Sequence, residues 1–277
     1  MIASMKTEST VTCSHVINPR NTMLNLLFNK IDNIGILTIN RPDALNALNR
    51  STLIELEAFL EHDLNQSGIL ALIITGAGNE AFIAGGDVKE MNTLSPHEMH
   101  EYLELGQRIT FLLEESDKII MAAINGFALG GGLEIALSCD FIYAKLSSKI
   151  GLPEVKLGLI PGFGGTQRLL RAIGLRRAKE WVLSGQIFTA VHAYEIGLVN
   201  KLFDDDELMP ESLKFLREVL GNSHCSIQAA KQIINQGADT ELKVAMQLEM
   251  KACESCFSSS DRLERMSSFI HRRASKA

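Results

Sequence analysis

The sequence predicts an α/β fold, because strand-like and helix-like segments alternate through about residue 200. Short aliphatic and β-branched runs of strand length recur between segments whose apolar residues repeat at helical spacing. From about residue 207 onward the pattern is entirely helical. We therefore expect a layered α/β core followed by a helical carboxyl-terminal part, with the acidic run at residues 204–206 as the candidate boundary.

The expected strands end at residues that break regular structure. Residues 32–33 predict a turn after the first strand, and Pro42 ends the second. Glycines at 76 and 78 close the third strand and lead to an expected loop over residues 82–87. The expected strands are residues 24–28, 35–39, 69–75, 119–124 and 140–144.

Helices are expected where the apolar period lengthens. Leucines three or four positions apart predict a helix over residues 51–67. Ser95 followed by Pro96 predicts the start of another, because serine caps a helix and proline fits its first turn. Further helices are expected up to Leu137, after Thr166 and throughout the part after residue 207.

Composition narrows the function classes. The chain has 277 residues, of which 46% are hydrophobic and 22% charged, as in ordinary globular proteins. A net charge of −6 argues against a nucleic-acid partner, and no apolar run is long enough to cross a bilayer. Among its five cysteines, Cys253 and Cys256 form a CxxC, but no second Cys or His pair lies nearby at zinc spacing, so we expect reduced thiols and no metal.

Three segments are expected along the chain: a disordered extension over residues 1–21, a core over residues 22–203 and a helical region over residues 204–277. The extension is polar, rich in Ser and Thr, and lacks the apolar centre of a secretion signal. This predicts a cytoplasmic protein. The mitochondrial matrix is the alternative if these residues are a transit peptide.

The segment from Asn125 to Glu134 carries the strongest chemical signal. Three consecutive glycines at 130–132 lead into Glu134, and Glu154 follows a second glycine at 151. Glycines at a strand-to-helix junction leave backbone N–H groups accessible to a ligand. A carboxylate beside such donors indicates acid–base chemistry next to an oxyanion hole. The glycine spacing fits neither a dinucleotide fingerprint nor a P-loop.

Several long motifs in the same order resemble the crotonase (enoyl-CoA hydratase/isomerase) superfamily, and most of all its enoyl-CoA hydratases. The motifs are residues 40–48, 81–91, 125–140, 151–169 and 266–272. The resemblance implies a spiral of ββα turns, a helical trimerisation region, and trimers that often stack into hexamers. It also implies an acyl-CoA thioester substrate, with no cofactor beyond the coenzyme A of that substrate.

Position by position, the resemblance implies that the N–H groups of Gly86 and Gly131 form the oxyanion hole. It implies that Glu134 and Glu154 are the catalytic carboxylates. We expect Glu134 to orient and deprotonate a water and Glu154 to protonate Cα of the substrate, while two N–H donors stabilise the enolate. The implied substrate and CoA contacts are Ala47, Leu48, Ala84, Asp87, Lys89, Phe163, Phe269 and Arg272.

Other functions remain open at this point. An enoyl-CoA isomerase shifts a double bond and generally uses one glutamate, so the pair Glu134 and Glu154 favours hydration. A hydratase of branched or dicarboxylic acyl groups is equally compatible with the motifs. A CoA-binding relative without catalysis is a remote alternative. Asp140 is expected to be a structural hydrogen-bond partner and not a catalyst.

Overall fold

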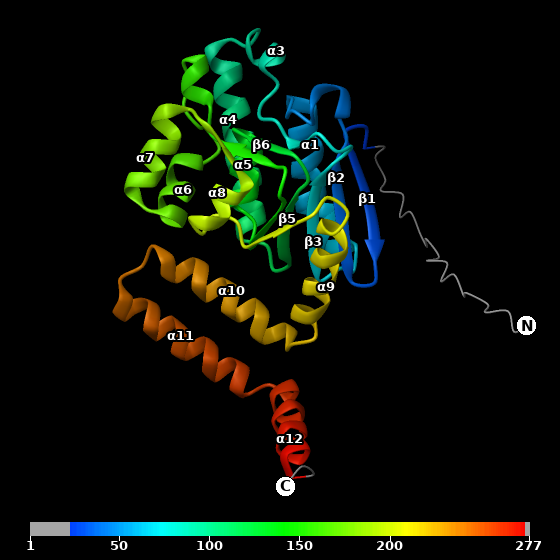
Figure 1. The fold of residues 1–277 in the computed structure, drawn as a ribbon. Helices are drawn as coiled ribbons and strands as arrows, with labels where there is room; N and C mark the ends of the chain where they lie inside the picture. The colour runs from blue at the N-terminus through cyan, green and yellow to red at the C-terminus, as the bar shows by residue number, and fades with distance from the viewer. Residues whose placement is uncertain (1–22, 275–277) are drawn as a thin grey trace, which may run out of the picture.

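The computed structural model describes residues 23–274, which form two β-sheets covered by helices and followed by a helical arm (Figure 1). The extension expected over residues 1–21 lies outside the described residues. The larger sheet has the strand order β1-β2-β3-β5-β7-β10; only β1 and β2 pair antiparallel. Its strands are β1 (Leu26–Ile31), β2 (Ile34–Ile39), β3 (Ala71–Gly76), β5 (Ile119–Ile124), β7 (Phe141–Lys145) and β10 (Lys201–Phe203).

The smaller sheet is built from strands of three residues in the order β4-β6-β8-β9. The first three each follow a strand of the larger sheet, so that β3–β4, β5–β6 and β7–β8 are successive turns of a spiral, whereas the fourth follows a helix. Helices close these turns, which confirms the predicted α/β fold of ββα units. The strands are β4 (Ala81–Ile83), β6 (Phe127–Leu129), β8 (Lys149–Gly151) and β9 (Ile187–Thr189).

Helices pack outside the sheets, and the last three extend from the body as an arm (Figure 1). Ser95 caps α4 in a reciprocal capping box with Glu98, as its sequence predicts. The α-helices are α1 (Arg50–Ala58), α2 (Leu64–Gln66), α3 (Val88–Met91), α4 (Pro96–Glu114), α5 (Gly131–Leu137), α6 (Gly165–Ile173), α7 (Leu175–Ser184), α8 (Ala190–Glu195), α9 (Leu208–Leu220), α10 (His224–Ala238), α11 (Leu242–Phe257) and α12 (Ser260–Ala274). Short 3-10 or π segments are η1 (Pro42–Ala44), η2 (Phe59–Asp63) and η3 (Glu154–Leu157).

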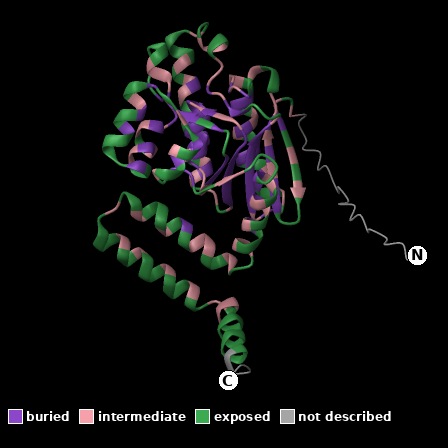
Figure 2. Cartoon of the chain, viewed as in Figure 1, coloured by how far each residue is buried: buried purple, intermediate pink, exposed green. Residues whose placement is uncertain are grey.

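The central strands are buried on both faces, which is typical of parallel sheets. In β3, Leu72 and Ile74 face the main core, whereas Ala71 and Ile73 face a second cluster that α9 covers. Burial is concentrated in this body, and the arm is mostly exposed (Figure 2). In the described part of the chain, no helix is long and apolar enough to span a bilayer.

The structure corrects one expectation on the way to the site. Residues 82–87 were expected to be a loop, but Phe82 and Ile83 belong to β4 and are fully buried. β4 pairs with β6 and ends directly before Ala84. Gly85 and Gly86 therefore come just after the end of β4, next to the loop that precedes α5.

Asn125 ties two turns of the spiral together where β5 ends. Its side-chain amide donates hydrogen bonds to the carbonyl oxygens of Gly76 and Gly78, both at 2.8 Å. Its Oδ1 accepts from the N–H of Gly76 at 3.2 Å. The side chain is buried, so these contacts replace water at the end of β3.

We expect Asn125→Ala to lower the free energy of unfolding by about 2–3 kcal/mol, because buried backbone groups at Gly76 lose their partners. Urea denaturation followed by circular dichroism measures the change. Asn29→Ala, at an exposed position of β1, is the control and is expected to change stability by less than about 0.5 kcal/mol. Equal losses in the two variants would contradict the prediction.

Candidate active site

Glu134 lies in the first turn of α5, and its side chain is buried in the body. Its Oε1 accepts hydrogen bonds from the backbone N–H groups of Phe163 at 2.8 Å and Gly165 at 2.6 Å. Burial raises the pKa of this carboxyl group, while the N–H donors and the Arg168 guanidinium act in the opposite direction. Glu134 is thus removed from water, and two backbone N–H groups stabilise the ionised form of its carboxyl group.

Glu154 begins η3, directly after Pro153. Its Oε2 is buried and forms no hydrogen bond within residues 23–274. Burial, together with the nearby charge of Glu134, raises the pKa of Glu154 to about 7. A carboxyl group in this state can donate or accept a proton near neutral pH.

Gly130 lies between the carboxyl group of Glu154 and the Gly85–Gly86 segment. Its φ of +50° is accessible to glycine at little cost, and a Cβ here would lie 2.8 Å from Oε1 of Glu154. The same Cβ would lie 3.7 Å from Cα of Gly85. The carbonyl oxygen of Gly130 accepts from the N–H of Glu134 at 3.0 Å. Gly130 therefore borders the Glu154 carboxyl group and Gly85, one helical turn before Glu134 in the chain.

The N–H groups of Gly86 and Gly131 form no hydrogen bond with any group of residues 23–274. Gly131 is the first residue of α5, where helical N–H groups lack partners. Gly86 forms a parallel bridge with Leu48, in which the neighbours Gly85 and Asp87 provide the hydrogen bonds. Both N–H groups therefore lack a partner within the described part of the chain.

Leu48 and Phe163 form the floor next to these glycines. Leu48 is fully buried, and its Cδ1 is 3.4 Å from the position of a Cβ at Gly131. The ring of Phe163 is 3.1 Å from the same position and packs against Tyr102, with centroids 5.5 Å apart. This side of the glycine segment is therefore apolar.

Asp87 holds its own loop. Its side chain accepts from the N–H of Glu90 at the start of α3 and forms an ion pair with Arg41 at 3.0 Å. Burial acts to raise the pKa of Asp87, but the hydrogen bonds and charge of Arg41 outweigh it and the pKa is lowered. Arg41 also donates to the carbonyl oxygen of Ala47, so this ion pair connects two segments that border the site.

The other expected contact residues divide into two groups. Ala84 directly follows β4, and its N–H donates a hydrogen bond to the carbonyl oxygen of Leu45. Lys89 is exposed on α3. Phe269 and Arg272 lie on α12, which projects from the body at the end opposite α3 (Figure 1). The structure does not bring these two residues to Glu134 and Glu154 of the same chain.

An apolar groove of about 470 Å³ lies between α3, the start of α4 and the segment after η3. Met91 connects it to the glycines, because its sulfur is 2.7 Å from the position of a Cβ at Gly86. The groove is lined chiefly by Met91, Leu94, Met99, Leu157 and Leu159. Within the described residues, no cluster of three or more His, Cys, Asp or Glu side chains is arranged to hold a metal.

Tyr102 supports the site and was not anticipated from the sequence. Its hydroxyl donates to the carbonyl oxygen of Leu48 at 2.8 Å, next to Gly86. Tyr102 shares a buried stripe of α4 with Leu105, Ile109 and Leu113. A tyrosine in such a stripe needs a partner for its hydroxyl, and this is the signal that could have identified it.

Comparison with known proteins now identifies the family. Residues 29–276 match the profile of the Enoyl-CoA hydratase/isomerase family. The chain is 41% identical over 249 residues to the crotonyl-CoA hydratase of Syntrophomonas wolfei, covering 90% of this chain and 96% of that protein. It is equally similar to the short-chain-enoyl-CoA hydratase of Clostridium acetobutylicum, with 41% identity covering 90% and 95% of the two chains.

Solved structures agree with the sequence matches. The enoyl-CoA hydratase of Bacillus anthracis superposes with a TM-score of 0.87 at 33% identity, covering 90% of this chain and 96% of that one. The chain therefore belongs to the enoyl-CoA hydratase/isomerase family, as its motifs predict.

The pKa of Glu154 predicts how stability changes with pH. Between about pH 4.5 and about pH 7, the folded protein retains the Glu154 proton that the unfolded chain releases. The folded state therefore binds more protons, and the free energy of unfolding falls as pH rises through this window. Glutamine at position 154 does not titrate, so only the wild type loses this stability as the pH rises. The free energy of unfolding of Glu154→Gln relative to wild type should therefore increase from about pH 5 to about pH 7.5.

Urea unfolding of wild type and Glu154→Gln at the two pH values measures this difference. Glu180→Gln, at an exposed position of α7, is the matched control and should show the same difference from wild type at both. A difference for Glu154→Gln that does not depend on pH would show that its carboxyl group titrates normally.

Proposed function

We propose that the protein is an enoyl-CoA hydratase, which adds water across the double bond of a trans-2-enoyl-CoA thioester to give a 3-hydroxyacyl-CoA. The observation that carries this proposal is the convergence of two carboxyl groups beside unpaired N–H groups. Glu134 has two backbone donors, whereas Glu154 has a raised pKa and a buried oxygen without a partner. The similarity to two hydratases over 90% of the chain supports it.

In the proposed reaction, Glu134 accepts a proton from water as the water oxygen bonds to Cβ. Electron density moves onto the thioester oxygen, which the N–H groups of Gly86 and Gly131 stabilise. Glu154 then delivers its proton to Cα, and a proton exchange between the glutamates or with solvent restores the starting state. A pKa near 7 suits Glu154 for this transfer, and the two N–H donors favour ionised Glu134.

The protein is proposed to need no separate cofactor, because the substrate is itself a thioester of coenzyme A. The apolar groove beside Met91 would accommodate the acyl chain, because it opens next to Gly86 and is lined by flexible methionine and leucine side chains. Ala47, Ala84 and Lys89 are proposed to contact the CoA part. The reaction would serve fatty-acid β-oxidation, in the cytoplasm or in the mitochondrial matrix.

Homo-oligomerisation is proposed to bring in α12. Apolar side chains of α11 and α12 are about half exposed or more, including Met246, Met250, Phe257 and Ile270. Exposure on this scale is typical of an interface between copies. A trimer, or a dimer of trimers, would cover this surface and could bring Phe269 and Arg272 to the site of a neighbouring copy.

Hydration of crotonyl-CoA tests the proposed activity through the loss of absorbance of the conjugated thioester. We expect Glu134→Gln and Glu154→Gln each to lower kcat by about 10²–10⁴-fold, the usual contribution of a general acid or base. Glu180→Gln should retain wild-type activity. Variants that hydrate as fast as wild type would refute the two-glutamate mechanism, and double-bond migration without hydration would identify an isomerase.

Light scattering coupled to size exclusion tests the proposed oligomer. We expect wild type at three or six times the chain mass of 30.5 kDa, and Ile270→Glu at a lower mass because a charge enters the apolar surface. Leu27→Glu, on exposed β1, is the control and should keep the wild-type mass. A monomeric wild type would contradict the proposal.

A further inference from the structure

The loop that holds Glu134 has two polar sides. Residues 162–165 direct two N–H groups, those of Phe163 and Gly165, at Oε1 of Glu134. The carbonyl oxygens of the same loop bond in other directions. Gly162 accepts from the side-chain amide of Gln107 at 2.9 Å, and Phe163 accepts from the hydroxyl of Thr110 at 3.1 Å. The long helix α4 thus fixes the loop from the side away from the carboxylate.

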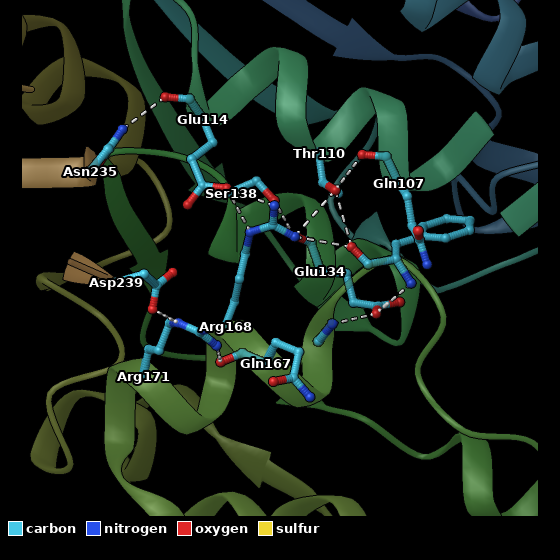
Figure 3. Close-up of polar contacts among 12 residues, drawn as sticks. Gln107, Thr110, Glu114, Glu134, Ser138, Gln167, Arg168, Arg171, Asn235 and Asp239 are labelled. Atoms are coloured by element: carbon cyan, nitrogen blue, oxygen red, sulfur yellow. Dashed lines mark hydrogen bonds and ion pairs between the residues drawn. The ribbon is translucent and has the colours of Figure 1, made fainter. Parts of the chain in front are cut away.

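Arg168 completes this arrangement from α6 (Figure 3). Its Nη1 donates to the carbonyl oxygen of Phe163 at 3.1 Å and to Oγ1 of Thr110 at 3.2 Å. Its Nε and Nη2 both donate to Oε2 of Glu114, at 3.1 and 2.7 Å. The guanidinium lies 5.3 Å from the centroid of the Phe111 ring.

This environment is specific for a guanidinium. The side chain of Arg168 is 13% exposed, and three residues of α4 contact its head group from one helix face. A planar group with several fixed N–H donors can satisfy the carboxylate and the carbonyl at once. A lysine ammonium could reach one partner well but has no rigid fork with which to hold both.

We propose that Arg168 is a positioning residue for Glu134, which locks the Phe163 carbonyl so that the N–H groups of the loop stay directed at the Glu134 carboxylate. Arg168 does not touch the reacting atoms. Its catalytic consequence rests on the proposed hydratase function, whereas the positioning itself rests on the contacts of the loop. A displacement of a reacting group by about 1 Å can lower a rate about 10²-fold.

The charge of Arg168 adds a second effect. The titratable groups that act on or near Glu134 are Arg168 from α6, Glu154 from η3 and Tyr102 from α4. Among these, Arg168 favours the ionised form of Glu134, and its neutralisation would raise the pKa of Glu134 further. Because the proposed mechanism needs ionised Glu134, the acidic limb of the pH profile of kcat should then move to higher pH.

The test compares Arg168→Met, Arg168→Lys and a control, Arg171→Met. Arg171 lies on the same helix but is half exposed and contacts Asp239 and the Gln167 carbonyl, away from the loop. We expect Arg168→Met to lower kcat for crotonyl-CoA about 10–100-fold with a small change in KM, and to shift the acidic limb upward. Arg168→Lys should keep the acidic limb close to wild type and recover part of kcat. Arg171→Met should match wild type.

Amide hydrogen exchange supplies a readout that does not need activity. Exchange at Phe163 and Gly165 should accelerate in Arg168→Met and not in Arg171→Met, both measured on the full chain. If Arg168→Met fails to fold, Thr110→Val removes the other donor to the Phe163 carbonyl and should give the same pattern to a smaller extent.

The outcomes separate the two proposals. Reduced stability of Arg168→Met with unchanged kcat, pH profile and exchange at Phe163 would overturn the positioning role. An increase in KM alone would also overturn it, because it would indicate a contact with substrate. If wild type does not hydrate crotonyl-CoA, the proposed function fails, and the exchange measurement still decides whether Arg168 holds the loop.

Discussion

The buried carboxylate of Glu134 is the group on which the arrangement of the site depends. A carboxylate removed from water is stable only with donors close by, and here the chain supplies two backbone N–H groups from the loop before α6. Gly165 has to be a glycine, because a Cβ there would lie 2.8 Å from Cγ of Glu134. These two N–H groups thus connect the start of α6 to the side chain of Glu134 on α5. Through the Phe163 and Gly162 carbonyls, the same requirement reaches α4.

Near Glu134, Gly126 and Gly132 are needed because two chain segments approach too closely for a side chain, and neither glycine has a positive φ. A Cβ at Gly132 would lie 2.1 Å from the carbonyl oxygen of Ile83, so only glycine lets α5 pack directly on β4. A Cβ at Gly126 would lie 2.1 Å from the carbonyl oxygen of Glu80, where β6 begins beside the start of β4. These contacts bring the end of β4 against the start of α5. As a result, Gly86 and Gly131 reach one side of the site although 45 positions of the sequence separate them.

The sequence predicted the central strands and α4 because each has a clear period and a strong boundary, as Ser95 shows for α4. The strands of the smaller sheet were expected only through the resemblance to ββα turns, since strands of three residues such as β6 contain too few positions for any period to appear. The motifs predicted Glu134 and Glu154 as a pair, and the structure sets the Glu154 carboxyl group beside Gly130, one helical turn before Glu134. Of the residues that support them, Tyr102 has a local signal in the buried stripe of α4, whereas Arg168 has none. Arg168 contacts a helix 54 positions away, and no local pattern encodes such a pairing.

The root of the helical arm has a mechanical consequence. Lys231 of α10 is buried, and its ammonium group bonds both to Asp140 and to the carbonyl oxygen of Lys118, each at 2.8 Å. Asp140 in turn accepts from the N–H of Ile120 in β5, which fits its expected structural role. Removal of the Lys231 ammonium alone would leave the largely buried Asp140 carboxylate without its cation, at about 3–5 kcal/mol. Through Asp140, Lys231 thus attaches the first helix of the arm to β5, so the arm joins the body at a central strand of the larger sheet.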